Sequence, residues 1–82
     1  MIVLPLSPKQ DKYLRDHGLV KKYTKQVEIL SSNIHHPGLN LELLEPKDKG
    51  IYSFRLDIHY RALFVFHSPE IVEIIVITNH YQ

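Results

Sequence analysis

The chain has 82 residues, a formal net charge of +1 and no cysteine, and 44% of its residues are hydrophobic while 23% are charged. This balance is typical of a globular protein, excludes a disordered chain, and predicts one domain that spans residues 1–82. Because cysteine is absent and no apolar stretch approaches the length of a membrane span, we exclude disulfides, thiolate metal sites and a transmembrane helix, and we expect a cytoplasmic protein.

The first half of the chain predicts a short strand and a helical hairpin. Residues 2–6 form an apolar run, and Ser7-Pro8-Lys9-Gln10 is typical of a capped helix start. The first helix should reach about residue 17, and Gly18 should end it. A second helix should follow and stop near residues 31–33, because its apolar residues recur every three or four positions. That stripe consists of Val20, Tyr23, Val27, Leu30 and Ile34.

The two predicted helices carry most of the positive charge. The first 25 positions contain only two acidic residues, Asp11 and Asp16. Their basic residues are Lys9, Lys12, Arg15, Lys21, Lys22 and Lys25. Lys21, Lys22, Lys25 and Gln26 lie off the apolar stripe. A basic surface of this kind suits a polyanion, and it is equally typical of a solvated helix face. Charge alone leaves both interpretations open.

The second half of the chain is typical of a sheet. Residues 34–38 predict a turn, residues 39–44 a strand, and residues 45–50 a charged loop. Two runs rich in β-branched and aromatic residues, 51–58 and 61–66, predict a β-hairpin. Residues 71–78 are apolar on both sides, as in a central strand. In the first run, apolar and polar residues alternate, and this alternation predicts that four side chains face the core: Tyr52, Phe54, Leu56 and Ile58.

This order predicts an α+β fold with a short N-terminal strand, a helical hairpin and then a three- to four-stranded antiparallel sheet. Two helices should cover one face of that sheet. The other face is left free for function.

Three short segments then resemble a known family. They are Tyr52-Ser53-Phe54-Arg55, Tyr60-Arg61-Ala62 and the closing Asn79-His80-Tyr81. With the strand, helical hairpin and apolar last strand, they resemble the RelE/ParE superfamily of bacterial toxins. The resemblance implies a toxin of a type II toxin–antitoxin pair, with a cognate antitoxin as partner. The RelE and YoeB-like branches cleave messenger RNA, usually on the ribosome, whereas the ParE branch inhibits DNA gyrase. The terminal His-Tyr is a feature of YoeB-like enzymes and favours an endoribonuclease.

The resemblance also implies site residues. Arg61 corresponds to the family arginine that contacts the scissile phosphate, and His80 and Tyr81 correspond to the terminal catalytic residues of YoeB-like members. In those members a glutamate ahead of the hairpin acts as base. The loop before Gly50 differs in length here, so Glu42 and Glu45 are both candidates.

Lysines form a second group of expected RNA contacts. The RelE branch places catalytic lysines ahead of the hairpin, where this chain has Lys47 and Lys49. On the second helix, Lys21, Lys22 and Lys25 are expected to contact ribosomal RNA.

The chemistry of these residues suits metal-independent RNA cleavage. The reaction needs a base for the 2′-OH, a cation for the phosphoryl oxygens and an acid for the leaving 5′-oxygen. Arg61 can offer phosphate a bidentate fork, His80 can transfer a proton near neutral pH, and Tyr81 can donate a proton or stack on a base. The alternative for Arg61 is an ion pair with Asp57 or Glu73.

Arg55 is the weaker arginine candidate, because it could contact phosphate or pair with Asp57. The pair His35-His36 stands without carboxylates or cysteines at ligand spacing and precedes Pro-Gly, so we expect a loop and neither a metal nor a cofactor. Two alternatives to a nuclease remain open at this point: a ParE-like gyrase inhibitor and a catalytically inactive binding module.

Overall fold

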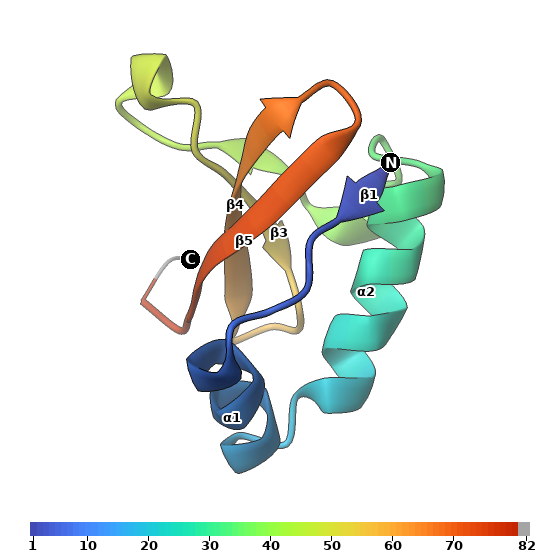
Figure 1. Cartoon of the computed structure of the whole chain (residues 1–82), viewed down its shortest axis with the longest axis vertical. Coiled ribbons are helices and arrows are strands. Elements are labelled where there is room, and N and C mark those ends of the chain that lie inside the picture. The colour runs from blue at the N-terminus through green and yellow to red at the C-terminus, as the bar shows by residue number, and fades with distance from the viewer. Residues whose placement is uncertain (81–82) are drawn as a thin grey trace.

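A computed structural model describes residues 1–80, which form a five-stranded mixed sheet with two helices packed beside it (Figure 1). The strands follow one another across the sheet in the order β1-β5-β4-β3-β2. Their bounds are Ile2–Val3 for β1, Glu42–Leu43 for β2, Tyr52–Arg55 for β3, Arg61–Ser68 for β4 and Ile71–Thr78 for β5. The helices are α1 (Pro8–Asp16) and α2 (Val20–Ser32), and two short 3₁₀ helices, η1 (Pro37–Leu39) and η2 (Lys47–Lys49), lie on either side of β2. The α+β fold expected from the sequence is confirmed.

Helix α1 begins and ends where the sequence predicts, because its flanking residues make the expected bonds. Ser7 Oγ accepts the N–H of Gln10 at 3.2 Å, and Gln10 Oε1 accepts the N–H of Ser7 at 3.1 Å, which completes a capping box. Gly18 then adopts a φ of 65°, a left-handed conformation that glycine tolerates without a steric penalty. Neither helix within residues 1–80 is both long and apolar enough to cross a bilayer.

Helix α2 packs on the sheet through a face that is rotated slightly from the predicted stripe. Leu30 is fully buried, and Tyr23 and Val27 pack against the core, as expected. Val20, however, is 44% exposed, and the buried stripe starts instead at Leu19, the N-cap residue.

Gln26 also differs from the sequence prediction, which placed it on the solvated side of the helix: in the structure this polar residue is buried. Its Nε2 donates to the carbonyl of Gly38 at 3.0 Å and to that of Arg55 at 2.7 Å. These bonds satisfy an amide that would otherwise be costly to bury.

The hydrophobic core lies between the two helices and the sheet. Its fully buried apolar side chains come from both layers: Leu14, Leu19, Leu30, Leu39, Phe54, Phe64 and Val72. Three phenylalanines pack against one another along the middle of the sheet: the rings of Phe54 and Phe64 are tilted, with centroids 5.9 Å apart, and those of Phe64 and Phe66 meet edge to face at 5.5 Å.

Strand β1 differs from the sequence prediction in its pairing. Ile2 and Val3 pair with Ile71 and Val72 of β5 in parallel orientation. The sheet is therefore mixed and has five strands, because the N-terminal strand joins it at the edge.

The predicted strand over residues 39–44 is shorter in the structure. Leu39 is buried at the end of η1, and Asn40 turns the chain with a φ of 50°, so that only Glu42–Leu43 pairs with β3. An asparagine in this left-handed conformation ends one segment and redirects the next.

The central hairpin has the predicted strands but a longer connection. Its first strand ends at Arg55, so Ile58 lies in the loop and is 83% exposed instead of facing the core. Asp57 causes this difference, because its Oδ1 accepts the N–H groups of His59 and Tyr60, each at 2.8 Å, and folds the chain into a turn.

Strand register assigns side chains to the two faces of the sheet. Phe54 of β3 is opposite Ala62 of β4, which in turn is opposite Ile77 of β5, and this row faces the helices. The alternate rows face the other way and contain Glu42, Ser53, Leu63 and Val76 in one row and Arg55, Arg61 and Thr78 in the next. We call this second side the open face.

Candidate functional site

Arg61 is the first residue of β4 and lies on the open face, yet only 5% of it is exposed. Its Nε donates to Ser53 Oγ at 2.9 Å, and its Nη2 donates to the carbonyl of Asn40 at 2.5 Å and to that of Ser53 at 3.3 Å. Neither Asp57 nor Glu73 takes part in these bonds. The alternative in which Arg61 pairs with Asp57 or Glu73 is therefore wrong, and uncharged acceptors hold Arg61 instead.

The charge of Arg61 is set by its burial and by two neighbouring side chains. Burial lowers the pKa of the Arg61 guanidinium, the charge of Glu42 opposes that shift, and the charge of Arg55 adds to it. Arg55 is directly opposite Arg61 in the register of β3 and β4, but it is exposed. A cation that is held at a fixed position with little water around it is suited to stabilising negative charge.

The structure separates the two candidate glutamates. Glu42 in β2 is opposite Ser53, the residue whose hydroxyl holds Arg61, and its charge acts on Arg61. Glu45 follows β2 in the connection to η2. Figure 1 shows η2 on an arm that projects away from the sheet, and this arm also carries Lys47 and Lys49. Glu42 therefore lies in the sheet near Arg61. Glu45, Lys47 and Lys49 lie outside the strands and are not placed next to Arg61.

The end of β5 lies beside the start of β4. Thr78 is opposite Arg61 and is buried, and its Oγ1 accepts the N–H of His80 at 3.1 Å. His80 is exposed and follows Thr78 by two residues, so the chain places it at the same end of the sheet as Arg61. Tyr81 lies outside the described residues.

A shallow pocket lies at this end of the molecule. It has a volume of about 390 Å³ and is lined by Ile58, His59, Tyr60 and Asn79. Tyr60 immediately precedes Arg61 and Asn79 immediately precedes His80, so the pocket adjoins the candidate site. An aromatic ring, an imidazole and an amide are groups that stack on and hydrogen-bond to nucleobases.

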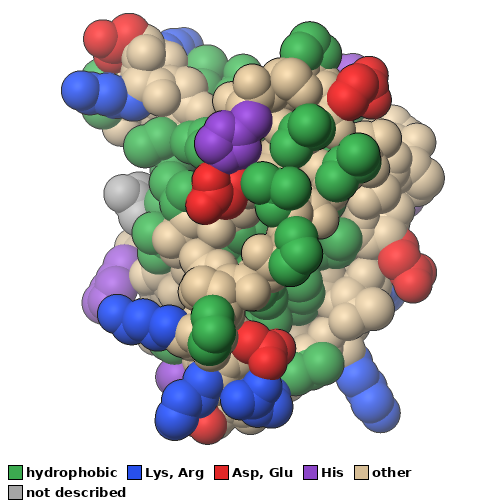
Figure 2. Space-filling view, in the orientation of Figure 1, with side chains coloured by type: hydrophobic (Ala, Val, Ile, Leu, Met, Phe, Trp, Pro, Cys, Tyr) green, Lys and Arg blue, Asp and Glu red, His purple; other side chains and the backbone are tan. Residues whose placement is uncertain are grey.

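The basic surface of the helices is partly neutralised by pairing. On α1, Lys12 pairs with Asp16 at 2.5 Å, and Arg15 pairs with Asp11. Figure 2 shows this mixture of positive and negative side chains at the end of the molecule that α1 forms. Lys21 and Lys25 are exposed on helix α2, which packs on the opposite side of the sheet from Arg61, so the structure does not bring these two lysines to the candidate site.

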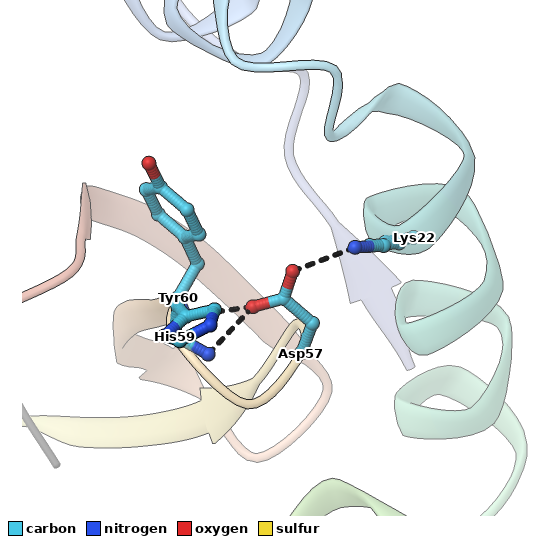
Figure 3. A network of polar contacts seen from close by, with 4 residues as sticks. All are labelled: Lys22, Asp57, His59 and Tyr60. Atoms are coloured by element: carbon cyan, nitrogen blue, oxygen red, sulfur yellow. Dashed lines mark hydrogen bonds and ion pairs between the residues drawn. The ribbon is translucent and has the colours of Figure 1, made fainter.

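Lys22 of α2 has a structural partner. Its Nζ lies 2.7 Å from Asp57 Oδ2, while Asp57 Oδ1 accepts the N–H groups of His59 and Tyr60 (Figure 3). Asp57 therefore pairs with Lys22, and the expected pair with Arg55 is not formed. Partial burial raises the pKa of Asp57, but the bonds from Lys22 and the two N–H groups outweigh it and hold the pKa of the carboxyl below its usual value.

This network predicts a pH-dependent stability. A carboxyl whose pKa is lowered by folding stabilises the fold above its unfolded pKa of about 3.9, and that contribution is lost as the pH falls through the folded value. We expect Asp57→Asn to lower the free energy of unfolding by about 1 kcal/mol at pH 7, because the amide keeps an acceptor but loses the charge. Urea unfolding at pH 7 and pH 3 measures the effect.

The difference between the parent and Asp57→Asn should shrink at the lower pH. Asp48→Asn, on the exposed η2, is the matched control and should change little at either pH. A difference that is the same at both values would contradict the role of the Asp57 charge.

Sequence reasoning missed Ser53 and Asn40. Ser53 is one of two serines in the second half of the chain, and nothing in the sequence shows that its hydroxyl holds an arginine; the Asn40 contact is made by a backbone carbonyl. Within residues 1–80, no group of three His, Asp or Glu residues could hold a metal ion. His36 of the pair His35-His36 instead uses Nδ1 to accept the N–H of Gly38 at 2.9 Å.

Comparison with known proteins identifies the fold. No protein-family model matches the sequence, and no match to a curated protein is significant. Among solved structures, the YoeB/ParE toxin from Agrobacterium tumefaciens matches with a TM-score of 0.70 at 20% identity, over 99% of this chain and all of the other. A chain of the heterotetrameric YoeB–YefM toxin–antitoxin complex from Staphylococcus aureus matches with a TM-score of 0.69 at 23% identity, over 96% and 93%.

The YoeB dimer from the same organism matches with a TM-score of 0.68 at 22% identity, also over 96% of this chain and 93% of the other. The matches cover nearly the whole of both chains. The chain thus has the fold of YoeB/ParE toxins, and the fold implied by the sequence resemblance is confirmed.

Proposed function

We propose that this chain is the toxin of a type II toxin–antitoxin system and that it is a metal-independent endoribonuclease acting on messenger RNA at the ribosome. The observation that carries the proposal is the buried Arg61 on the open face, where Glu42 influences its charge and Thr78, two residues before His80, lies opposite it. The YoeB/ParE fold supports the same reading. A fixed cation with a carboxylate and an imidazole nearby meets the needs of phosphodiester cleavage.

In this mechanism Glu42 is the general base. Its carboxylate takes the proton of the 2′-OH, and the 2′-oxygen then attacks the adjacent phosphorus. Arg61 stabilises the negative charge on the phosphoryl oxygens, and His80 donates a proton to the 5′-oxygen as its bond to phosphorus breaks. The products are a 2′,3′-cyclic phosphate and a free 5′-hydroxyl. Tyr81 is the second terminal residue that we assign to the site, as proton donor or stacking group.

The other expected residues act in binding within this proposal. Lys47 and Lys49 on the projecting arm, together with exposed Arg55, would contact the RNA backbone. Lys21, Lys22 and Lys25 would contact ribosomal RNA from the other side of the molecule. The pocket beside Tyr60 would hold a base next to the cleaved phosphate. Glu45 is the less favoured base, because it lies toward the arm.

A cognate antitoxin is the expected protein partner, and the cytoplasm is the expected compartment. One matched structure is a YoeB–YefM toxin–antitoxin complex, which supports a partner of this kind. Co-expression with the neighbouring open reading frame should then give a stable complex.

One observation favours a second candidate. Arg61 is already bonded to Ser53 and Asn40, as a purely structural arginine would be. In a ParE-like inhibitor of DNA gyrase, or in an inactive binding module, Arg61 would need only this structural role.

Induced expression distinguishes these candidates. We expect growth arrest within minutes, with new 5′ ends in messenger RNA at positions set by ribosomes, and with unchanged plasmid supercoiling. RNA end mapping and a gyrase supercoiling assay measure the two outcomes, and cells that express Arg61→Ala at equal level are the control. Loss of supercoiling without RNA cuts would favour the gyrase inhibitor, and normal growth with folded protein would favour the binding module.

A further inference from the structure

We propose that Ser53 is a positioning residue for Arg61, and that Ser53 and the carbonyl of Asn40 decide which nitrogen of Arg61 meets the phosphate. The inference rests on the nuclease function proposed above. Ser53 has no exposed surface, and it bonds Arg61 twice, through its hydroxyl at 2.9 Å and through its carbonyl at 3.3 Å. Asn40 adds a third acceptor at 2.5 Å.

A count of donors shows what these bonds leave available. An arginine has five N–H donors, of which Nε carries one and each terminal nitrogen carries two. The bonds to Ser53 Oγ, Ser53 O and Asn40 O use Nε–H and both N–H groups of Nη2. Nη1 takes no part in them and carries the other two donors. The phosphate would therefore meet the Nη1 end of Arg61, and not a fork that includes Nη2.

The position of Ser53 in the sheet explains why it can do this. Arg61 is opposite Arg55, and Ser53 is two residues before Arg55 on the same strand, so Ser53 and Arg61 are diagonal neighbours on the open face. The Arg61 side chain reaches along the sheet toward Ser53 and lies against it. Without the Ser53 hydroxyl, Nε–H would have no acceptor at this buried position, and the guanidinium could rotate away.

Asn40 contributes through its backbone, so a side-chain substitution does not remove its carbonyl. Its left-handed φ of 50° belongs to the turn that presents this carbonyl to Nη2. Ser53 is consequently the residue through which the proposal is tested.

We expect Ser53→Ala to lower kcat on ribosome-bound messenger RNA by about 10- to 100-fold and to change KM by less than about threefold, because a small misplacement of a catalytic group acts on the transition state. The effect should depend on Arg61. In an Arg61→Ala background, Ser53→Ala should cost less than about twofold more, since there is no guanidinium left to position. Ser68→Ala, another strand serine, whose hydroxyl accepts the N–H of Glu70, is the matched control and should cleave like the parent.

Nuclear magnetic resonance provides a readout that does not depend on cleavage. In the parent, the Nε–H of Arg61 should exchange slowly with water, because it is buried and bonded to Ser53 Oγ. Ser53→Ala should speed this exchange by at least about tenfold. If Ser53→Ala does not fold, Ser53→Cys keeps the size of the side chain and offers only a weak acceptor, and it should give the same result.

The outcomes separate this inference from the proposed function. If the parent cleaves RNA and Ser53→Ala cleaves equally well, or costs the same factor with and without Arg61, the positioning role is wrong and the nuclease remains. If the parent does not cleave RNA, the proposed function fails, and the exchange rate decides: unchanged exchange of Arg61 Nε–H in Ser53→Ala overturns the positioning role, and faster exchange supports it.

Discussion

Arg61→Ala is expected to lower the rate of RNA cleavage by about 100- to 1000-fold, because it removes the only arginine that the structure holds buried on the open face of the described chain. The loss should appear in kcat, since the cation acts on charge that develops in the transition state. Stability should fall by about 1–3 kcal/mol, because the three acceptors of Ser53 and Asn40 lose their donor. A domain of this size tolerates that loss. Single-turnover cleavage of ribosome-bound message and thermal unfolding measure the two effects.

Arg61→Lys and Arg55→Ala complete this experiment. A lysine keeps the charge but has one nitrogen in place of three in a planar fork, so it cannot reproduce the contacts of Nε and Nη2 and also present Nη1 to phosphate, and it should restore little activity. Arg55 is exposed on the same face, and its loss should cost about tenfold or less. Folded Arg61→Ala that cleaved within a few-fold of the parent would place the site elsewhere, and the gyrase inhibitor or the binding module would then be favoured.

Leu30→Asp is expected to unfold the protein at 25 °C. Leu30 is fully buried between α2 and the sheet, and an unpaired charge there costs several kcal/mol, which is comparable with the whole stability of a small domain. Circular dichroism and urea unfolding measure the result. Thr24→Asp places the same charge on an exposed position of the same helix and should remain folded. If Leu30→Asp melted like the parent, the assigned packing of α2 would be wrong.

Local sequence signals predicted the elements whose limits are set by neighbouring residues. The capping box at Ser7 and Gln10 fixed the start of α1, and the apolar run of residues 71–78 gave the full length of β5. The faces of the central hairpin also followed from alternation as far as Leu56. Such signals act over a few residues, and so they can be read without knowing the rest of the fold.

Predictions failed where contacts between distant parts of the chain, or a side chain that folds a local turn, decide the structure. Gln26 is buried because carbonyls of Gly38 and Arg55 come to it from other parts of the chain. Ile58 is exposed because Asp57 bonds the N–H groups that follow it, and an alternating pattern does not reveal that turn. The parallel pairing of β1 likewise depends on where residues 71–72 lie.

Some residues of the candidate site could likewise be predicted from the sequence, and others needed the structure. Arg61 could be singled out as the one charge that opens an apolar strand, and the resemblance gave it a role. The choice between Glu42 and Glu45 needed strand register, because only register places Glu42 opposite the serine that holds Arg61. Ser53 belongs to a segment that resembles the family, but the sequence does not reveal the contacts of its hydroxyl and carbonyl with Arg61.

The segment from Gly38 to Asn40 is held from two sides. Gln26 Nε2 donates to the carbonyl of Gly38 from the helical layer, and Arg61 Nη2 donates to the carbonyl of Asn40 from the open face. The two carbonyls are only two residues apart, so helix α2 and Arg61 hydrogen-bond to the same short segment of the chain. The buried amide of Gln26 therefore fixes, from the helical side of the sheet, the same turn whose carbonyl holds Arg61 on the open face.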